Sequence, residues 1–211
     1  MKSHEFASLL CSRLCHDLLS PVGALNNGIE LLADEHDPEM RARCLELLAE
    51  SARASANKLK FFRLAFGAAG GFADEVDTRE ARAAIEGLFG GDGRMQLGWV
   101  IDEPVMSKAA MKVLLNVVLI AGDALVRGGS LDVGAEKHDH GLDIVVRAEG
   151  SRIVLDPELK KVLIGETAED EVAPRAAAAW LVHCLIEEGG GQIQVSDEQE
   201  GLLLIGASLP A

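Results

Sequence analysis

His16 is the residue of this chain whose neighbours best suit it to chemistry. Residues 16–21 read HDLLSP. A carboxylate such as Asp17 can accept a hydrogen bond from one imidazole nitrogen and leave the other as a nucleophile. Pro21 removes a backbone donor and crowds the carbonyl of Asp17, so we expect a kink just beyond His16. A histidine nucleophile held in this way suits phosphoryl transfer through a covalent intermediate.

The helix expected to carry His16 directs it away from the apolar side. At about 100° per residue, with Leu14 at zero, the apolar positions lie within about 40° of Leu14. They are Leu18, Pro21, Leu25, Gly28 and Leu32. His16 falls at about 200°, among small and polar residues. Such a lane would let another protein approach the imidazole, although the position also fits an ordinary solvent-exposed histidine.

Two long helices are predicted, over residues 3–33 and 38–66, and they should pair as an antiparallel hairpin. Asp37 suits an N-cap and Pro38 the first helical position. The second helix keeps a spacing of four and three residues that is typical of a coiled-coil seam. That seam comprises Leu45, Leu48, Ala52, Ser55, Leu59, Phe62 and Phe66. Because two helices alone cannot surround so wide an apolar arc, we expect a homodimer with a four-helix bundle.

The pattern changes after residues 67–71 (GAAGG), which we interpret as a hinge. Beyond it the sequence predicts helices over 77–89, 107–126 and 173–188, and strands over 130–136, 142–149, 191–196 and 201–209. Helices mixed with mostly antiparallel strands indicate a two-layer α/β sandwich. The expected fold class is therefore α+β, with a hairpin domain over 1–68 and an α/β domain over 72–211.

The composition excludes several classes of protein. The net charge is −14, from 20 basic and 34 acidic residues, which argues against nonspecific nucleic-acid binding. No apolar run approaches the roughly 20 residues of a membrane span, and the N-terminus lacks a signal peptide's apolar core. The cytoplasm is the expected compartment, with the four cysteines as reduced thiols.

Other chemistry-bearing residues have simpler explanations. His138 and His140 stand in a polar turn, and without further ligands we interpret them as a solvated loop. Cys11 and Cys15, four residues apart, are expected to pack at the edge of the hairpin seam. The glycines at 189–191 predict a turn, since no helix opens after them. We therefore expect no metal site and no bound cofactor.

The motif HDLLSP resembles the H-box of dimeric sensor histidine kinases. The longer run LCSRLCHDLLSPVGALNNGIELL, residues 10–32, resembles the ChpT-type histidine phosphotransferases of alphaproteobacteria. The resemblance implies that His16 accepts a phosphoryl group and that Asp17 orients it. It implies two partners, the receiver domain of a hybrid histidine kinase and that of a response regulator, with Mg²⁺ held by the receiver.

The same resemblance suggests which residues surround the reaction. Ser20 and Pro21 support the H-box, and Arg13 and Lys60 would offset phosphate charge. Receiver docking would run along the first helix from His16 towards the loop. The residues expected there are Gly23, Ala24, Asn27, Gly28 and Leu31.

The kinase nucleotide motifs are altered. Asn116 matches the first asparagine of the N-box, but the Mg²⁺-ligating asparagine falls at Ile120, and isoleucine cannot bind a hard cation. The adenine-reading aspartate falls at Ala148. Two glycines of the second glycine loop fall at Ala176 and Ala178, whose side chains would obstruct phosphates. We therefore expect a kinase-like fold that has lost nucleotide binding.

Two other functions remain open from the sequence. One is an active ATP-dependent histidine kinase, which would need the nucleotide site. The other is an inert dimeric scaffold, which would tolerate the loss of His16.

Overall fold

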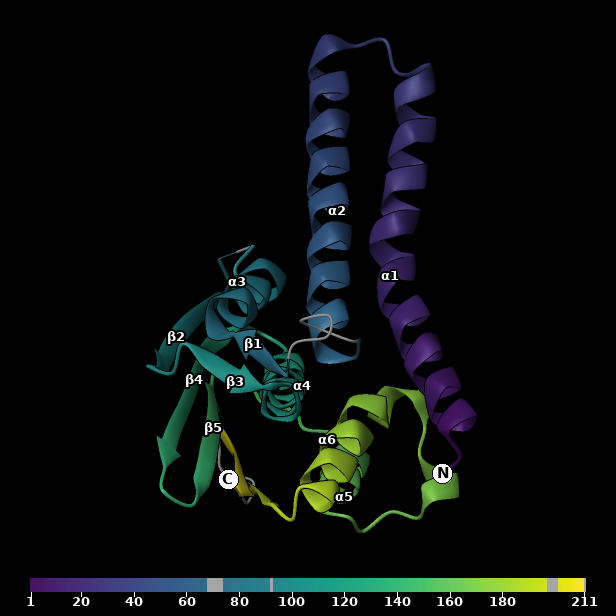
Figure 1. Ribbon diagram of the computed structural model, residues 1–211. Helices are drawn as coiled ribbons and strands as arrows, with labels where there is room; N and C mark the ends of the chain where they lie inside the picture. Colours follow the sequence, from purple (N-terminus) through teal and green to yellow (C-terminus); the bar gives the residue numbers. More distant parts are fainter. Residues whose placement is uncertain (68–73, 92, 197–200, 211) are drawn as a thin grey trace.

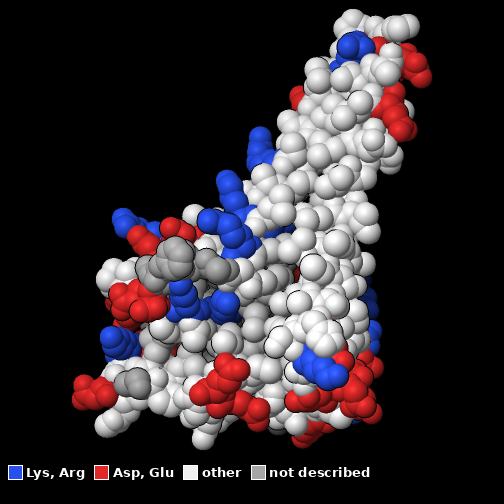
Figure 2. Space-filling view, turned by 45° about the vertical axis from the view of Figure 1, so that its right-hand side comes forward, with Lys and Arg blue, Asp and Glu red and all other residues white. Residues whose placement is uncertain are grey.

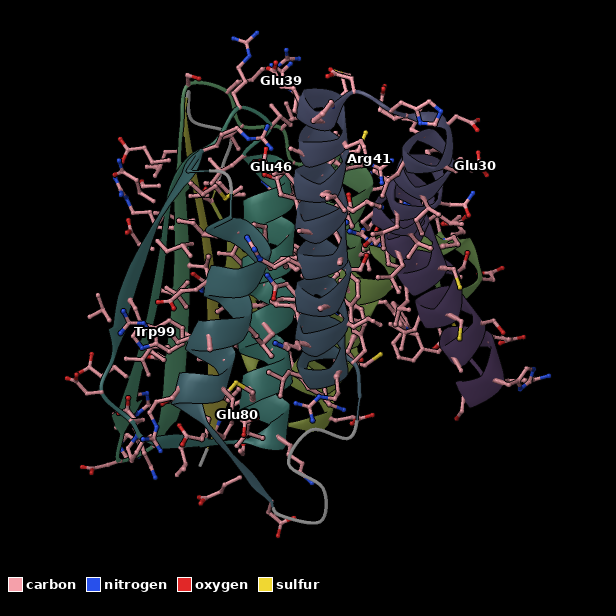
Figure 3. All side chains as sticks on the ribbon, turned by 90° about the horizontal axis from the view of Figure 1, so that it is seen from above. Glu30, Glu39, Arg41, Glu46, Glu80 and Trp99 are labelled. Atoms are coloured by element: carbon pink, nitrogen blue, oxygen red, sulfur yellow. The ribbon has the colours of Figure 1, made fainter. Side chains whose placement is uncertain are left out.

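A helical hairpin rises from an α/β unit in the computed structural model, which describes residues 1–211 except 68–73, 92, 197–200 and 211 (Figure 1). The hairpin consists of α1 (Ser3–Asp34) and α2 (Pro38–Ala65), as predicted. Asp37 caps α2 by accepting hydrogen bonds from the backbone nitrogens of Glu39 and Met40. Arg41, labelled in Figure 3, closes the connection by donating to the carbonyls of Leu32 and Glu35 at 3.0 and 2.6 Å.

The contact between the two helices includes only part of the predicted seam. Leu48 packs directly against Gly28, where an added Cβ would lie 2.8 Å from a Leu48 methyl carbon. Phe62 is buried, but the side chains of Leu45 and Leu59 are 54% and 51% exposed. The prediction that these two leucines face α1 is therefore wrong. The repeat of four and three residues instead divides into two stripes: Leu48, Ser55 and Phe62 lie on the inner side of α2, whereas Leu45, Ala52 and Leu59 are exposed.

A five-stranded sheet forms one layer of the α/β unit, in the order β2-β4-β5-β7-β6. These strands are β2 (Met95–Ile101), β4 (Gly129–His138), β5 (Gly141–Glu149), β6 (Gln192–Val195) and β7 (Leu202–Pro210). The β2–β4 pair is parallel and the other pairs are antiparallel. Two further short strands, β1 (Glu75–Asp77) and β3 (Val105–Ser107), pair with each other.

Helices cover one face of this sheet and complete the two-layer sandwich that the sequence predicts. They are α3 (Thr78–Phe89), α4 (Lys108–Ala124), α5 (Pro157–Leu163) and α6 (Ala177–Glu188). Two short 3₁₀ turns, Glu169–Glu171 and Pro174–Ala176, lead into α6. Seen from above, the sheet, the helical layer with α3 and α4, then α2 and then α1 follow one another (Figure 3).

The base of the hairpin shares the core of the α/β unit. Phe61, Phe62, Leu64 and Ala65 at the end of α2 are buried and belong to the same hydrophobic cluster as α4 and the sheet. Asn116, fully buried in α4, donates through Nδ2 to the carbonyl of Ala65 at 3.0 Å. Most of the predicted hinge lies outside the described residues. Among those described, no helix combines the length and apolar composition of a membrane span.

Candidate functional site

His16 lies on α1 with its side chain 83% exposed, as the helical pattern predicts. Its Nδ1 atom is 3.1 Å from Oδ1 of Asp17. If Nδ1 carries the proton and donates it to this carboxylate, Nε2 keeps its lone pair and remains open to an incoming group. The geometry thus provides an imidazole nucleophile on an accessible surface.

Asp17 is held from its other side by Arg13. Only 15% of the Asp17 side chain is exposed, and its Oδ2 accepts from Nε of Arg13 at 2.6 Å. The two residues are four positions apart, so one helical turn brings them together. Asp17 therefore has one carboxylate oxygen for His16 and one for Arg13.

Arg13 also reaches into the α/β unit. Its Nη2 donates to Oδ2 of Asp123 at 2.8 Å, and its Nη1 donates to the carbonyl of Arg175 at 3.2 Å. Burial disfavours the charge of Arg13, but its hydrogen bonds and the charges of Asp17 and Asp123 outweigh this and raise its pKa. All three guanidinium nitrogens of Arg13 bind groups of this chain. The structure therefore differs from the expectation that Arg13 offsets the charge of a phosphate.

Pro21 explains a contact that the sequence did not reveal. Because proline has no N–H, the carbonyl of Asp17 four residues earlier lacks its helical donor. Lys58 of α2 supplies one, with its Nζ 2.8 Å from that carbonyl oxygen. The helix continues through Pro21, and Figure 1 shows α1 bending part-way along its length. Proline and lysine together fix the backbone beside His16.

Lys60, the predicted supporting lysine, lies elsewhere. It lines a cavity of about 290 Å³ between α2 and α3, together with Asn57, Arg63 and Glu80. Two residues of helix rotate the side chain by about 200°, so Lys58 and Lys60 point to opposite sides of α2. The expectation that Lys60 serves the His16 site is therefore wrong, and Lys58 is the lysine that α2 brings there.

Most of the predicted docking residues remain accessible. Nothing lies within 4 Å of the position that a Cβ of Gly23 would take. Asn27 and Leu31 line a shallow cavity of about 530 Å³ near the hairpin tip, which also includes Glu30, labelled in Figure 3. Ser20 and Ala24 are exposed as well. Gly28 differs, because it packs against Leu48 inside the hairpin and offers no docking surface.

Basic side chains gather beside this site despite the acidic composition. Figure 2 shows most of the visible Lys and Arg where the hairpin meets the α/β unit, with some Asp and Glu beside them and both signs at the hairpin tip. A cavity of about 600 Å³ at this junction is lined by three basic residues, Arg53, Lys58 and Arg94, and by two acidic ones, Glu50 and Asp123. The charge pattern favours approach of an acidic partner at the junction.

The positions that match the kinase nucleotide motifs hold buried apolar side chains. Ile120, Ala148, Ala176 and Ala178 are each at most 3% exposed. The backbone nitrogen of Val154, in the loop after β5, donates to the carbonyl of Ala124 at the end of α4. Asn116, the one matching asparagine, binds the end of α2 instead. A cavity of about 810 Å³ lies beyond this loop, beside α5 and β7, with no α4 residue in its lining.

The remaining candidates form no second site. His138 contacts Asp143 at 3.3 Å, and no group of three or more His, Cys, Asp or Glu side chains in the described residues is placed to hold a metal. Cys11 and Cys15 were expected to pack at the edge of the hairpin seam, but both are exposed on the single chain.

Comparisons with known proteins agree with this geometry. Residues 78–201 match the family described as "Histidine phosphotransferase C-terminal domain". The Protein phosphotransferase ChpT of Brucella abortus (strain 2308) is 33% identical over 199 residues, which cover 94% of this chain and 93% of the relative.

Solved structures are similar as well. One described as a bacterial phosphotransferase superposes with a TM-score of 0.86 and 31% identity, covering 98% of this chain and 97% of the other. The catalytic domain of the histidine kinase ThkA aligns with 64% of this chain and 94% of its own at 16% identity and a TM-score of 0.47. On its sequence relatives and its matching family, the chain belongs to the histidine phosphotransferases.

Proposed function

We propose that this chain relays a phosphoryl group between the receiver-domain aspartates of a hybrid histidine kinase and a response regulator, through a phosphohistidine at His16. The observation that carries the proposal is an exposed imidazole whose Nδ1 is held by a carboxylate while Nε2 stays accessible. The similarity to a phosphotransferase along nearly the whole chain supports it. With these partners, we expect the reaction to take place in the cytoplasm.

The reaction needs few groups from this chain. Nε2 of His16 attacks the phosphorus of the receiver's aspartyl phosphate; the P–N bond forms as the P–O bond breaks, and the aspartate leaves as a carboxylate. The imidazole gains positive charge, which the adjacent Asp17 carboxylate stabilises. Attack by the aspartate of a second receiver reverses these steps. Mg²⁺ on the receiver would neutralise the phosphoryl oxygens.

The ATP-dependent kinase alternative lacks support at the positions that would hold the nucleotide. A buried isoleucine stands where Mg²⁺ would be bound, and a buried alanine where adenine would be read. A ligand that binds the native state must raise its melting temperature. We therefore expect millimolar Mg²⁺-ATP to leave the melting temperature unchanged, and micromolar affinity by calorimetry would restore the kinase alternative.

We also propose that the chain is a homodimer. An apolar stripe runs along one side of the hairpin, with Leu19, Val22 and Ile29 of α1 each at least 50% exposed. Around the axis of α1, with Leu14 at zero, the stripe lies at angles of about 60–140°. Arg13 and Asp17 face the α/β unit and lie at about 260° and 300°, on the other side of the helix. Leu45 and Leu59 continue the stripe on α2. Pairing two such stripes would complete a four-helix bundle and leave His16 outside it.

A transfer assay separates the relay from an inert scaffold. A receiver domain carrying radiolabelled aspartyl phosphate is mixed with the wild type, with His16→Ala, and with His36→Ala as a matched control. The relay predicts rapid labelling of the wild type and the control, onward transfer to a second receiver, and no labelling of His16→Ala. Full transfer through His16→Ala would contradict it.

A further inference from the structure

A continuous chain of polar contacts connects His16 to the end of α4 in the α/β unit. It runs from Nδ1 of His16 to Asp17, from Asp17 to Arg13, and from Arg13 to Asp123 of α4, with separations of 3.1, 2.6 and 2.8 Å. Asp123 lies 110 residues from Arg13 in the sequence. The chain therefore joins the two units of the molecule at the proposed site of chemistry.

We propose that Arg13 and Asp123 are positioning residues that act through Asp17 to hold the His16 imidazole in its reactive tautomer and orientation. Neither residue touches the phosphoryl group in this account. The inference rests on the proposed function, because it assigns these residues a part in transfer at His16.

Arg13 restricts the carboxylate that His16 depends on. A carboxylate that contacts only an exposed imidazole can rotate about its side chain. The Arg13 contact to Oδ2 removes that freedom and keeps Oδ1 towards Nδ1. Lys58 holds the backbone carbonyl of the same residue, so both ends of Asp17 are fixed.

Asp123 restricts Arg13 in turn. Arginine has many rotamers, and one partner on its own helix would not fix the guanidinium plane. Asp123 and the carbonyl of Arg175 bind its two terminal nitrogens. α4 supplies a rigid frame, since most of its residues are buried. The imidazole is thus connected to α4 through three charged side chains, those of Asp17, Arg13 and Asp123.

Asp123 does not stabilise its own helix. A carboxylate in the last turn meets the negative end of the helix dipole, which is unfavourable. Desolvation also raises the pKa of Asp123, against the opposing attraction of Arg13. Its hydrogen-bond partner is Arg13, with a further attraction from Lys58, and both of these residues bind Asp17 beside His16.

The competing explanation is that the Arg13–Asp123 pair only holds α1 against the α/β unit, as a structural clamp. Kinetics can separate this clamp from a positioning role. Loss of a clamp would lower the melting temperature or weaken receiver binding, without changing the rate at saturating receiver. Loss of positioning would lower that saturating rate. Effects carried through such networks are typically about 2- to 30-fold.

The test compares Arg13→Gln, Asp123→Asn and the double variant with the wild type. Arg147→Gln is the matched control, because Arg147 pairs with Asp132 and Glu149 in the sheet, away from His16. Single-turnover transfer from a labelled receiver gives the saturating rate and the half-saturating concentration. We expect both single variants to lose about 2- to 30-fold in the saturating rate, and the double variant to lose no more than the worse single one. Asp123→Glu should recover part of the rate.

Nitrogen NMR of ¹⁵N-histidine-labelled protein reads the imidazole directly and needs no receiver. In the wild type, His16 should show the tautomer with the proton on Nδ1, and in Arg13→Gln and Asp123→Asn a mixture of tautomers. Variants that keep the wild-type tautomer and saturating rate would overturn the positioning role. If the wild type accepted no phosphoryl group, the proposed function would fail, while the tautomer measurement would still decide whether these residues position His16.

Discussion

At the scale of single residues, the H-box proline has a structural consequence on the neighbouring helix. Pro21 withholds a donor from the carbonyl of Asp17, and Lys58 supplies it from α2. The nucleophile is therefore held by a backbone contact as well as by a carboxylate. This arrangement explains why a proline four residues after Asp17 is compatible with an uninterrupted helix.

Removing that donor should have a measurable cost. Lys58→Met keeps the aliphatic part of the side chain but leaves a partly buried carbonyl without its partner. We expect a loss of about 1–3 kcal/mol in the free energy of unfolding, measured with urea. Lys60→Met is the matched control and should stay within about 0.5 kcal/mol of the wild type. Equal losses in both variants would rule out the Lys58 contact.

The sequence predicts contacts only between residues that are close together along one helix. His16 and Asp17 are adjacent and their face follows from helical periodicity, so both could be predicted. Lys58 and Asp123 are separated from their partners by 41 and 110 positions, and only the tertiary fold brings them together. The sequence is compatible with a lysine on either face of α2, so it does not distinguish Lys58 from Lys60.

At the scale of elements, local signals predicted the longer helices and four strands of the sheet, but not α5 or β2. An Asp-Pro pair begins both α2 and α5, yet only the longer helix was predicted, because the seven residues of α5 carry too short a pattern. β2 was missed since Gly98 interrupts its alternation. A Cβ at that glycine would lie 2.1 Å from a carboxylate oxygen of Asp132, so the glycine leaves room for that side chain in its present position.

The start of α3 provides a pH-dependent test. Hydrogen bonds from Arg79 lower the pKa of Asp77 below its ordinary value of 3.8. A lowered pKa stabilises the fold above that ordinary value, and the stabilisation disappears as the pH falls through the lowered pKa. Asp77→Asn keeps a capping residue but loses the charge. It should therefore be less stable than the wild type at pH 7, with a difference that narrows in acid.

Urea unfolding of both proteins across this pH range measures the difference. Arg79→Gln should show part of the same pH dependence, because it removes the side-chain hydrogen bonds to Asp77 but keeps the one from the backbone nitrogen of residue 79. A stability difference that stays constant from neutral to acid pH would contradict the role assigned to the Asp77–Arg79 pair.

At the scale of the whole molecule, the hairpin is continuous with the α/β unit at its base and free along one side. Figure 2 shows a long part of the hairpin surface almost without charged side chains. The sequence predicted that the apolar arc is too wide for two helices. It could not show which leucines face inwards, since both stripes on α2 have the same spacing.

Leu59→Glu tests the proposed dimer. Leu59 is 51% exposed in the single chain, so a monomer should tolerate the glutamate, whereas a four-helix bundle would bury an unpaired charge. We expect sedimentation to show the wild type at twice the 22.4 kDa chain mass and Leu59→Glu at the monomer mass. Leu31→Glu is the matched control on the docking side of α1 and should remain dimeric. A wild type that sediments as a monomer at micromolar concentration would exclude the bundle.

The position of the transferred phosphoryl group tests the central claim most directly. The wild type is labelled by a phosphorylated receiver, and the modified residue is located by mass spectrometry under neutral conditions. We predict a single phosphoryl group on His16, lost in acid and stable in alkali as a phosphoramidate is, and no modification of His16→Ala. A phosphoryl group on any other residue, or undiminished labelling of His16→Ala, would contradict the account.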